Sequence, residues 1–275
     1  MLRIRYLVYW LIFSPVIATE NAAELFDKSW NASDDSMKQQ IRKKIIDIAP
    51  DSEYGLFSRA YFAEDKKEAV RLFTEAIAIR ADFWQAYVSR ARLHMDLEQF
   101  EEAIHDFKEA LLLNPKYEDD YVELALCIHT LYEKELRRGV PNAESLHEAL
   151  HFVNKAIAKE NKEAFAYYLR ANIKFYLSDI RGAIGDYDKA IARDSKLSSI
   201  WSGRAAAHCR LQEISKCESD INTAIKLDPK NYHAFFIRGT LRAIKKQKQS
   251  ACKDLSFAGE NGIKEAYEII KAYCQ

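Results

Sequence analysis

The chain has 275 residues, of which 48% are hydrophobic and 30% are charged, so it can bury a continuous core. Lysine plus arginine and aspartate plus glutamate both number 41, which gives a formal net charge of zero at pH 7. This balance argues against a protein that binds nucleic acid or an anionic membrane through its overall charge. We therefore predict no nucleic-acid partner.

Residues 1–18 have the layout of a secretory signal peptide. Arg3 and Arg5 precede an apolar run over residues 6–13, and a short segment ending at Ala18 precedes polar residues. We predict cleavage after Ala18 and export to the periplasm or the outside of the cell. The apolar run is short for a membrane span, so an uncleaved anchor is the alternative. Membrane contact would then be confined to this segment.

Residues 19–52 predict an N-terminal helical cap. One helical pattern covers residues 19–30 and a second covers residues 36–48. The internal repeat that begins at residue 53 places Pro50 two units before Pro115, in the same register. The second helix of the cap therefore occupies the second-helix position of a degenerate repeat.

An internal repeat occupies most of the chain. Residues 84–117 contain two amphipathic helical patterns with a polar turn at residues 96–99 between them. A small residue recurs in the first helix of each copy, at Ala60, Ala91, Ala125, Ala171, Ala205 and Gly239. Small residues let two helices cross closely, because a larger side chain would push the axes apart. The first spacing in this series is shorter than the regular one and the third is longer, which places one deletion and one insertion between paired helices.

The copies predict six helical hairpins, over residues 53–83, 84–117, 118–163, 164–197, 198–231 and 232–262. In the third, the first helix continues to Arg138 before Gly139 ends it, and Ser145 with Glu148 predicts a capping box for the second. The taller hairpin either docks a partner or is a tolerated insertion. A last helix over residues 263–275 is expected to cap the final repeat.

These copies resemble the tetratricopeptide repeat family, helix-turn-helix units of about 34 residues with a W-x2-L-G-x2-Y…A-x3-F…P pattern. The first aromatic position holds Tyr87, Tyr121, Tyr167, Trp201 and Phe235. The Tyr position departs from the pattern and holds His94, Lys174, His208 and Arg242. The resemblance implies an all-α fold, a right-handed superhelical solenoid with terminal capping helices. The style of the C-terminal region is similar to that of bacterial members, which together with the signal segment suggests an exported bacterial type.

The resemblance also implies a non-enzymatic scaffold whose first helices line a concave groove for a protein or peptide. Carried over position by position, the partner-binding residues are Tyr61, Arg92, His129, Phe165, Tyr168, Asn172, Phe175, Tyr176 and Phe236. The fourth copy is the richest in aromatic residues, and exposed aromatics beside polar groups are typical of a recognition patch. The alternative is that some of them pack against a neighbouring helix.

One variant of the family binds the carboxylate tails of chaperone ligands through Lys, Asn, Asn, Lys and Arg. The corresponding positions of this chain hold Phe57, Tyr61, Ser89, Asp119 and Glu123. The resemblance therefore does not extend to that carboxylate clamp.

A formal H-E-x-x-H motif occurs at His147, Glu148 and His151. In metalloproteases the two histidines bind zinc and the glutamate activates water. Here Glu148 also fills an ordinary repeat position, the register predicts an outward face for both histidines, and no third ligand can be assigned. We predict that the chain is not an enzyme and that it has no cofactor, no metal ligand and no catalytic residue. A zinc-dependent hydrolase at this motif is one alternative, and a structural subunit of an envelope assembly is another.

Five cysteines would meet an oxidising compartment if the chain is exported. Cys252 begins the second helix of the last copy and Cys274 ends the terminal helix. If the terminal helix folds back antiparallel, these two ends meet, so we predict a disulfide between them. Cys127, Cys209 and Cys217 are expected to be free thiols, Cys217 because it fills a small core position. Without export, all five are expected to be reduced.

Overall fold

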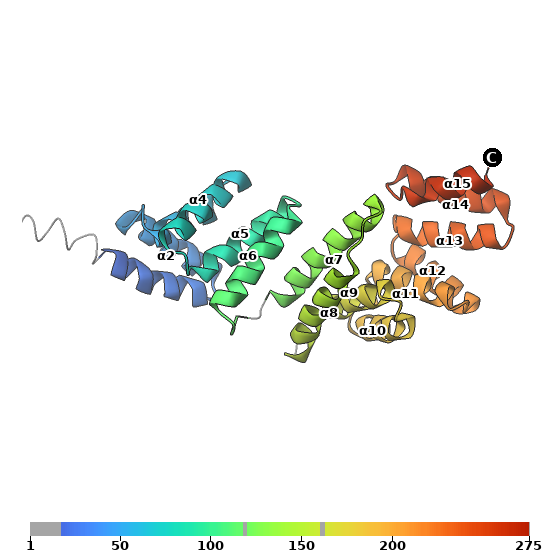
Figure 1. Cartoon of the computed structure of the whole chain (residues 1–275), viewed down its shortest axis with the longest axis horizontal. Helices are drawn as coiled ribbons and strands as arrows, with labels where there is room; N and C mark the ends of the chain where they lie inside the picture. The colour runs from blue at the N-terminus through green and yellow to red at the C-terminus, as the bar shows by residue number, and fades with distance from the viewer. Residues whose placement is uncertain (1–17, 118–119, 160–162, 275) are drawn as a thin grey trace, which may run out of the picture. The chain divides into compact units, whose positions relative to one another are not determined.

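The computed structural model describes residues 18–117, 120–159 and 163–274 (Figure 1), and these ranges contain helices and no strand. The predicted all-α repeat fold is confirmed. The chain divides into a first unit, Met1–Asp120, and a second unit, Tyr121–Gln275, and each is described separately. The predicted signal segment, residues 1–18, lies outside the described residues except for Ala18. Within the described ranges, no helix is both long and apolar enough to cross a membrane.

The first unit begins with helical residues 18–31 and continues with α2 (Asp35–Ile48), α3 (Glu53–Phe62), α4 (Lys66–Ile79), α5 (Trp84–Asp96) and α6 (Phe100–Leu113). Its core is aromatic. The rings of Phe26 and Phe57 lie 4.9 Å apart, and those of Phe57 and Phe73 lie 5.0 Å apart. Because Phe26 comes from the N-terminal helix, the cap and the first hairpin share one core.

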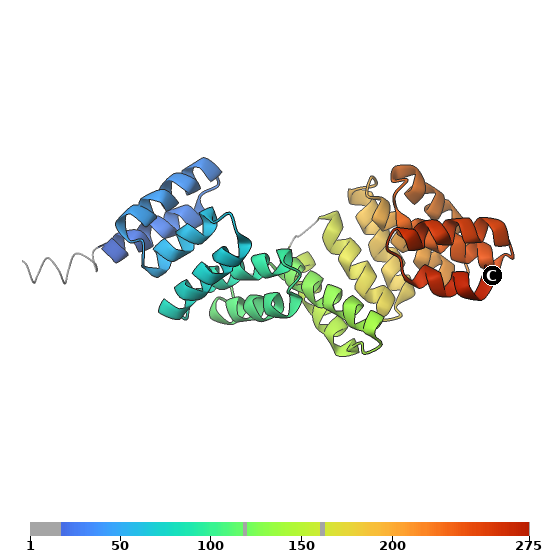
Figure 2. The same ribbon diagram turned by 90° about the horizontal axis from the view of Figure 1, so that it is seen from above.

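The second unit consists of α7 (Tyr121–Arg138), α8 (Ala143–Ala158), α9 (Ala164–Tyr176), α10 (Ile180–Arg193), α11 (Ser198–Arg210), α12 (Ile214–Leu227), α13 (Tyr232–Ile244), α14 (Lys248–Glu260) and α15 (Glu265–Tyr273). Consecutive helices from α7 to α14 pair as hairpins, and α15 packs against α14 (Figure 2). Each hairpin also packs against the next one in the chain.

The hairpin of α7 and α8 is the irregular one. α7 has 18 residues whereas α9 has 13, and Gly139, in the left-handed region at φ 79°, follows its last residue. The capping box predicted at Ser145 is wrong, because α8 begins earlier. The Asn142 side chain accepts a hydrogen bond from the Glu144 amide, and the Ser145 hydroxyl donates to the Asn142 carbonyl. Asparagine is a strong N-cap residue, so it starts the helix before the serine is reached.

Four hairpins carry the same ion pair between their two helices, which we call the hairpin ion pair. In each, a guanidinium donates two hydrogen bonds of 2.7–2.8 Å to a buried carboxylate: Arg90–Asp106, Arg170–Asp186, Arg204–Asp220 and Arg238–Asp254. The four aspartates are 1–4% exposed. Such a bidentate geometry is what a buried carboxylate requires if it is to remain charged.

The hairpin ion pair explains why the Tyr position departs from the family pattern. The side chain at that position lies one helical turn after the arginine and approaches the same carboxylate: His94 at 3.8 Å, Lys174 at 2.6 Å, His208 at 3.8 Å and Arg242 at 2.6 Å. A basic side chain at this position gives the buried aspartate a second partner that can carry a positive charge. A tyrosine side chain cannot carry a positive charge.

Candidate functional site

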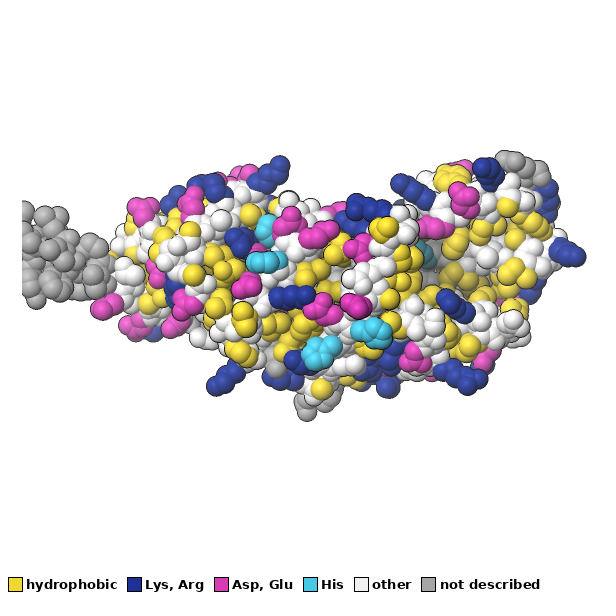
Figure 3. Space-filling model, viewed as in Figure 1, with side chains coloured by type: hydrophobic (Ala, Val, Ile, Leu, Met, Phe, Trp, Pro, Cys, Tyr) yellow, Lys and Arg dark blue, Asp and Glu magenta, His cyan; other side chains and the backbone are white. Residues whose placement is uncertain are grey.

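A cavity of about 710 Å³ lies within the second unit. We call it the second-unit groove. It is lined by the first helices of the hairpins, α7, α9, α11 and α13, by Tyr187 of α10, and by residues that precede α13 and α15. A cavity of this size is within the range of ligand-binding clefts. Side chains of both charge signs are interspersed over the face of the chain shown in Figure 3, so charge alone does not mark this site.

The groove brings together six of the nine predicted partner-binding residues: His129, Phe165, Tyr168, Asn172, Phe175 and Tyr176. Tyr61 and Arg92 line a different cavity, in the first unit. Phe236 lines neither cavity, because it packs against a core cluster that contains Leu255 and Ala258. Six residues thus share one surface, and Phe236 belongs to the core of the last hairpin.

Part of the groove lining is polar but uncharged. The Tyr187 hydroxyl donates a 2.6 Å hydrogen bond to Asn172 Oδ1, and Asn231 Nδ2 donates to Ser198 Oγ at 3.0 Å and to Ser202 Oγ at 3.3 Å. Burial raises the pKa of Tyr187 well above its usual value, so this hydroxyl stays protonated. Amide and hydroxyl groups of this kind suit the hydrogen-bonding groups of a polypeptide backbone.

Gly203 of α11 allows the Tyr187 ring to line the groove. A Cβ atom at this position would lie 2.7 Å from Cε1 of Tyr187, closer than any ordinary contact. The absence of a side chain therefore lets α11 pass over the ring of α10. Sequence reasoning missed both residues, because Tyr187 fills a consensus packing position of its repeat.

One corner of the groove is formed by Glu133, His129 and Tyr176. The Tyr176 hydroxyl donates a 2.9 Å hydrogen bond to Glu133 Oε1, and His129 Nε2 lies 4.0 Å from the same oxygen. Burial lowers the pKa of His129, and the nearby Glu133 carboxylate opposes this only in part. His129 is 4% exposed, and its Nε2 has no hydrogen-bond partner among the described residues. A ligand donor or a water molecule would satisfy this nitrogen.

The aromatic side chains of the groove differ in their solvent exposure. Phe165 is 39% exposed, whereas Tyr168 and Phe175 are partly buried against the core cluster of α9, α10 and α11. The Arg210 guanidinium lies 5.4 Å from the centre of the Phe175 ring. Phe165 is therefore the aromatic group most available to a partner, and the other two also serve packing.

The chain is similar in sequence to proteins built from helical repeats. Residues 84–117 match the sequence profile of the family described as "Tetratricopeptide repeat". The chain is 23% identical over 215 residues to "Stress-induced-phosphoprotein 1" of Caenorhabditis elegans, covering 68% of this chain and 64% of the relative. It is 21% identical over 218 residues to "Hsp70-Hsp90 organizing protein" of Triticum aestivum, covering 70% and 37%. The chain thus spans less than two thirds of the length of these relatives.

A crystal structure of a tetratricopeptide repeat protein from Parabacteroides merdae superposes with a TM-score of 0.59 and 17% sequence identity, covering 93% of this chain and 98% of that one. The comparisons support the tetratricopeptide repeat family. In this chain, the first helices of the second-unit hairpins, α7, α9, α11 and α13, line the groove.

The H-E-x-x-H motif lies on α8, and its residues do not line the second-unit groove. His147 and His151 are both exposed, as the repeat register predicts. Within the described ranges, no three His, Cys, Asp or Glu side chains are placed to hold a metal ion. Among the described residues, the two histidines therefore have no third ligand of the kind that a zinc site requires.

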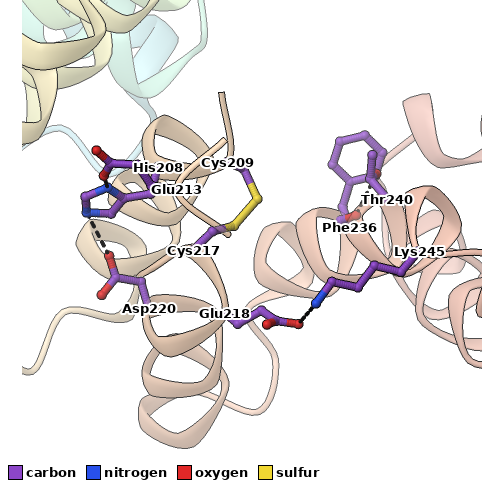
Figure 4. Close-up of a disulfide and its surroundings, with 9 residues drawn as sticks. All are labelled: His208, Cys209, Glu213, Cys217, Glu218, Asp220, Phe236, Thr240 and Lys245. Atoms are coloured by element: carbon purple, nitrogen blue, oxygen red, sulfur yellow. Dashed lines mark hydrogen bonds and ion pairs between the residues drawn. A yellow bond between two sulfur atoms is a disulfide. The ribbon is translucent and has the colours of Figure 1, made fainter. Parts of the chain in front are cut away.

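Two disulfides join helices of the last hairpins. Cys252 and Cys274, the pair named from the sequence, are bonded at 2.00 Å and join α14 to the end of α15. Cys209 and Cys217 are bonded at 2.02 Å and join α11 to α12 (Figure 4), so the expectation that both are free thiols is wrong. The tight turn between these helices brings their Cα atoms to 5.2 Å, and the eight-residue spacing across that turn was the missed signal. Cys127 remains free and buried, and burial raises the pKa of its thiol to about 12.

Proposed function

We propose that this chain is a non-enzymatic binding module whose second-unit groove holds a segment of a partner protein. The observation that carries the proposal is the convergence of Phe165, Asn172, Tyr187 and Asn231 on one cavity of about 710 Å³. An exposed ring offers a hydrophobic anchor, and the amides and hydroxyls offer hydrogen bonds to a backbone. The similarity to "Hsp70-Hsp90 organizing protein" supports a protein partner, although this chain lacks the carboxylate-clamp residues.

The test is site-specific photocrosslinking. A photoreactive residue at Phe165 is expected to crosslink a partner polypeptide from the native source, and the same residue at Lys253 on α14 is not. Lys253 is exposed and does not line the groove, so it controls for nonspecific labelling. Equal labelling at both positions would contradict the assignment of the groove.

A competition arm makes the test quantitative. Phe165→Ala removes a half-exposed ring without opening the core, and loss of an interface anchor of this kind costs about 2 kcal/mol of binding, or roughly 30-fold in affinity. A partner that binds the variant as tightly as the wild type does not use this groove.

We propose in addition that the chain is exported to an oxidising compartment. Two observations support this: the charge and hydrophobicity pattern of residues 1–18, and the two disulfides Cys209–Cys217 and Cys252–Cys274. The measurement is alkylation of unreduced protein from separated cell fractions, followed by mass mapping. All five cysteines alkylated in protein from its native compartment would overturn the proposal.

A further inference from the structure

A second cavity, of about 620 Å³, lies entirely within the first unit. We call it the Arg42 pocket. Its walls come from the N-terminal helix, α2, α3, α4 and α5, and they combine the rings of Trp30, Phe57 and Tyr61 with the guanidinium of Arg42. It shares no residue with the second-unit groove, so a ligand of the Arg42 pocket is independent of the proposed function.

Arg42 is an unusual charge because it is only 6% exposed and none of the described carboxylates pairs with it. Its Nε donates a 3.1 Å hydrogen bond to the buried Ser29 hydroxyl, which is its only hydrogen bond within the described ranges. The guanidinium carbon lies 3.8 Å from the centre of the Tyr61 ring and 5.4 Å from that of Phe57. A guanidinium remains charged at physiological pH, so stacking and one neutral hydrogen bond leave its charge largely uncompensated.

The partly buried arginines of the hairpin ion pairs differ from Arg42 because they have carboxylate partners. In all four hairpin ion pairs the guanidinium is matched by a buried aspartate through two hydrogen bonds. Arg42 is the buried arginine that lacks such a carboxylate in the described part of the chain. Burying an unpaired charge is costly, and a carboxylate that entered the pocket would remove that cost.

The other charged groups of the pocket do not supply this carboxylate. Asp35 acts on Arg42 electrostatically, but its side chain is 79% exposed and is engaged by Lys38 at 3.3 Å. Glu64 also lines the pocket, but it is exposed and no ion pair between it and Arg42 occurs in the described part of the chain. Lys66 pairs with Asp96 at 2.7 Å and Arg92 pairs with Asp120 at 2.6 Å. Because these neighbouring cations are already paired, a ligand with several negative charges would find a single open cation among the described pocket residues. The aromatic wall favours an apolar or aromatic group next to the ligand charge.

We propose that the Arg42 pocket binds a monocarboxylate attached to an apolar or aromatic group. The Nη donors of the planar guanidinium have no hydrogen-bond partner among the residues that the structure describes, and they match the two oxygens of a carboxylate. Stacking on Tyr61 fixes the plane of the guanidinium. Such a group occurs both in a free organic acid and at the carboxyl terminus of a peptide that ends in an apolar residue.

The experiment is a calorimetric titration of the full chain at pH 7 with phenylacetate and with its neutral amide, phenylacetamide. The acid is expected to bind and the amide to bind at least ~10-fold more weakly, because only the acid forms charge-assisted hydrogen bonds. A peptide ending in Gly-Gly-Phe, with a free or an amidated terminus, forms the second arm. A free-terminus peptide that binds at least ~10-fold more tightly than phenylacetate assigns the pocket to peptide ends, and comparable affinities assign it to organic acids; either result supports the carboxylate site.

Three variants locate the binding. Arg42→Gln is expected to weaken phenylacetate binding by at least ~10-fold. Ser89→Phe, which fills the pocket from α5 without altering Arg42, is expected to do the same and decides the matter if Arg42→Gln fails to fold. Arg71→Gln removes an arginine from α4 whose charge pairs with Glu68 and Glu75 outside the pocket, and it should bind as the wild type does. No binding of any carboxylate by the folded wild-type chain, equal binding of acid and amide, or unchanged binding by a folded Arg42→Gln or Ser89→Phe variant would each refute the proposal.

Discussion

Replacing Asp186 by asparagine should destabilise the second unit more than any neighbouring charge change. The carboxylate is 1% exposed and accepts hydrogen bonds from Arg170 at 2.7 and 2.8 Å and from Lys174 at 2.6 Å. Removing one partner of a buried ion pair leaves the others buried without compensation, which costs about 3–5 kcal/mol. Such a loss is a large fraction of the total stability of an ordinary domain, about 5–15 kcal/mol.

Asp188 provides the matched control on the same helix. Its side chain is 56% exposed and bonds Arg204 at 2.6 Å. Asp188→Asn should cost less than about 1 kcal/mol, because exposed pairs are screened by water. Urea unfolding followed by circular dichroism measures both variants. A similar free energy of unfolding for Asp186→Asn and Asp188→Asn would refute the argument that burial makes the hairpin ion pair important.

The pH dependence gives an independent check on Asp186. Burial alone would raise its pKa, but hydrogen bonds and charges from Arg170 and Lys174 outweigh burial and hold the pKa below its usual value. A lowered folded-state pKa contributes stability that is present above the unfolded pKa, about 3.9, and is lost as pH falls through the folded value. The difference between wild type and Asp186→Asn should therefore be constant from pH 7 to pH 5 and shrink below about pH 4. A gap that persists unchanged at pH 2 would contradict this linkage.

Three further measurements test other features of the molecule. Ala171→Trp should overpack the crossing of α9 with its neighbours and cost about 1–3 kcal/mol, so an unchanged melting temperature would contradict the repeat register. Cys252→Ser should cost about 3 kcal/mol and Cys209→Ser about 2.5 kcal/mol, since the bridges close loops of 22 and 8 residues; equal stability of oxidised and reduced wild type would exclude both effects. Burial lowers the pKa of His129, so its contribution to stability is present above pH ~6.5 and lost as pH falls below that value. His129→Gln should flatten the stability curve between pH 7 and pH 5, and an identical slope in the variant would rule out this histidine as its source.

Most of the fold could be predicted from the register of the internal repeat. The polar turn predicted at residues 96–99 lies between α5, which ends at Asp96, and α6, which begins at Phe100. The repeat period predicts the helices because each close helix crossing requires a small residue, and this requirement remains when other positions of the repeat differ. The prediction was wrong where an insertion interrupts the period. The start of α8 is set by Asn142, which caps the helix, and the repeat pattern does not specify a capping residue there.

The groove could be predicted only in part, because exposure depends on neighbours that sequence does not reveal. The register placed Phe165 and Asn172 on the lining helix, but it placed Phe236 there too, and that ring packs into the last core cluster. Glu133 lies in the extension of α7, for which no other copy offers a counterpart. The Arg42 pocket could not be foreseen either, because it joins the N-terminal cap to positions of α3 and α5.

The hairpin ion pair also bears on how such an array grows. Its two partners are always 16 residues apart within one unit, so copying one repeat copies a complete, already neutralised pair. In three of the four pairs the arginine also donates to the preceding hairpin, each through a different acceptor: Thr74 for Arg90, Asn154 for Arg170 and Asp188 for Arg204. The charge of each pair is therefore balanced within one hairpin, while the polar contact to the preceding hairpin differs from one junction to the next.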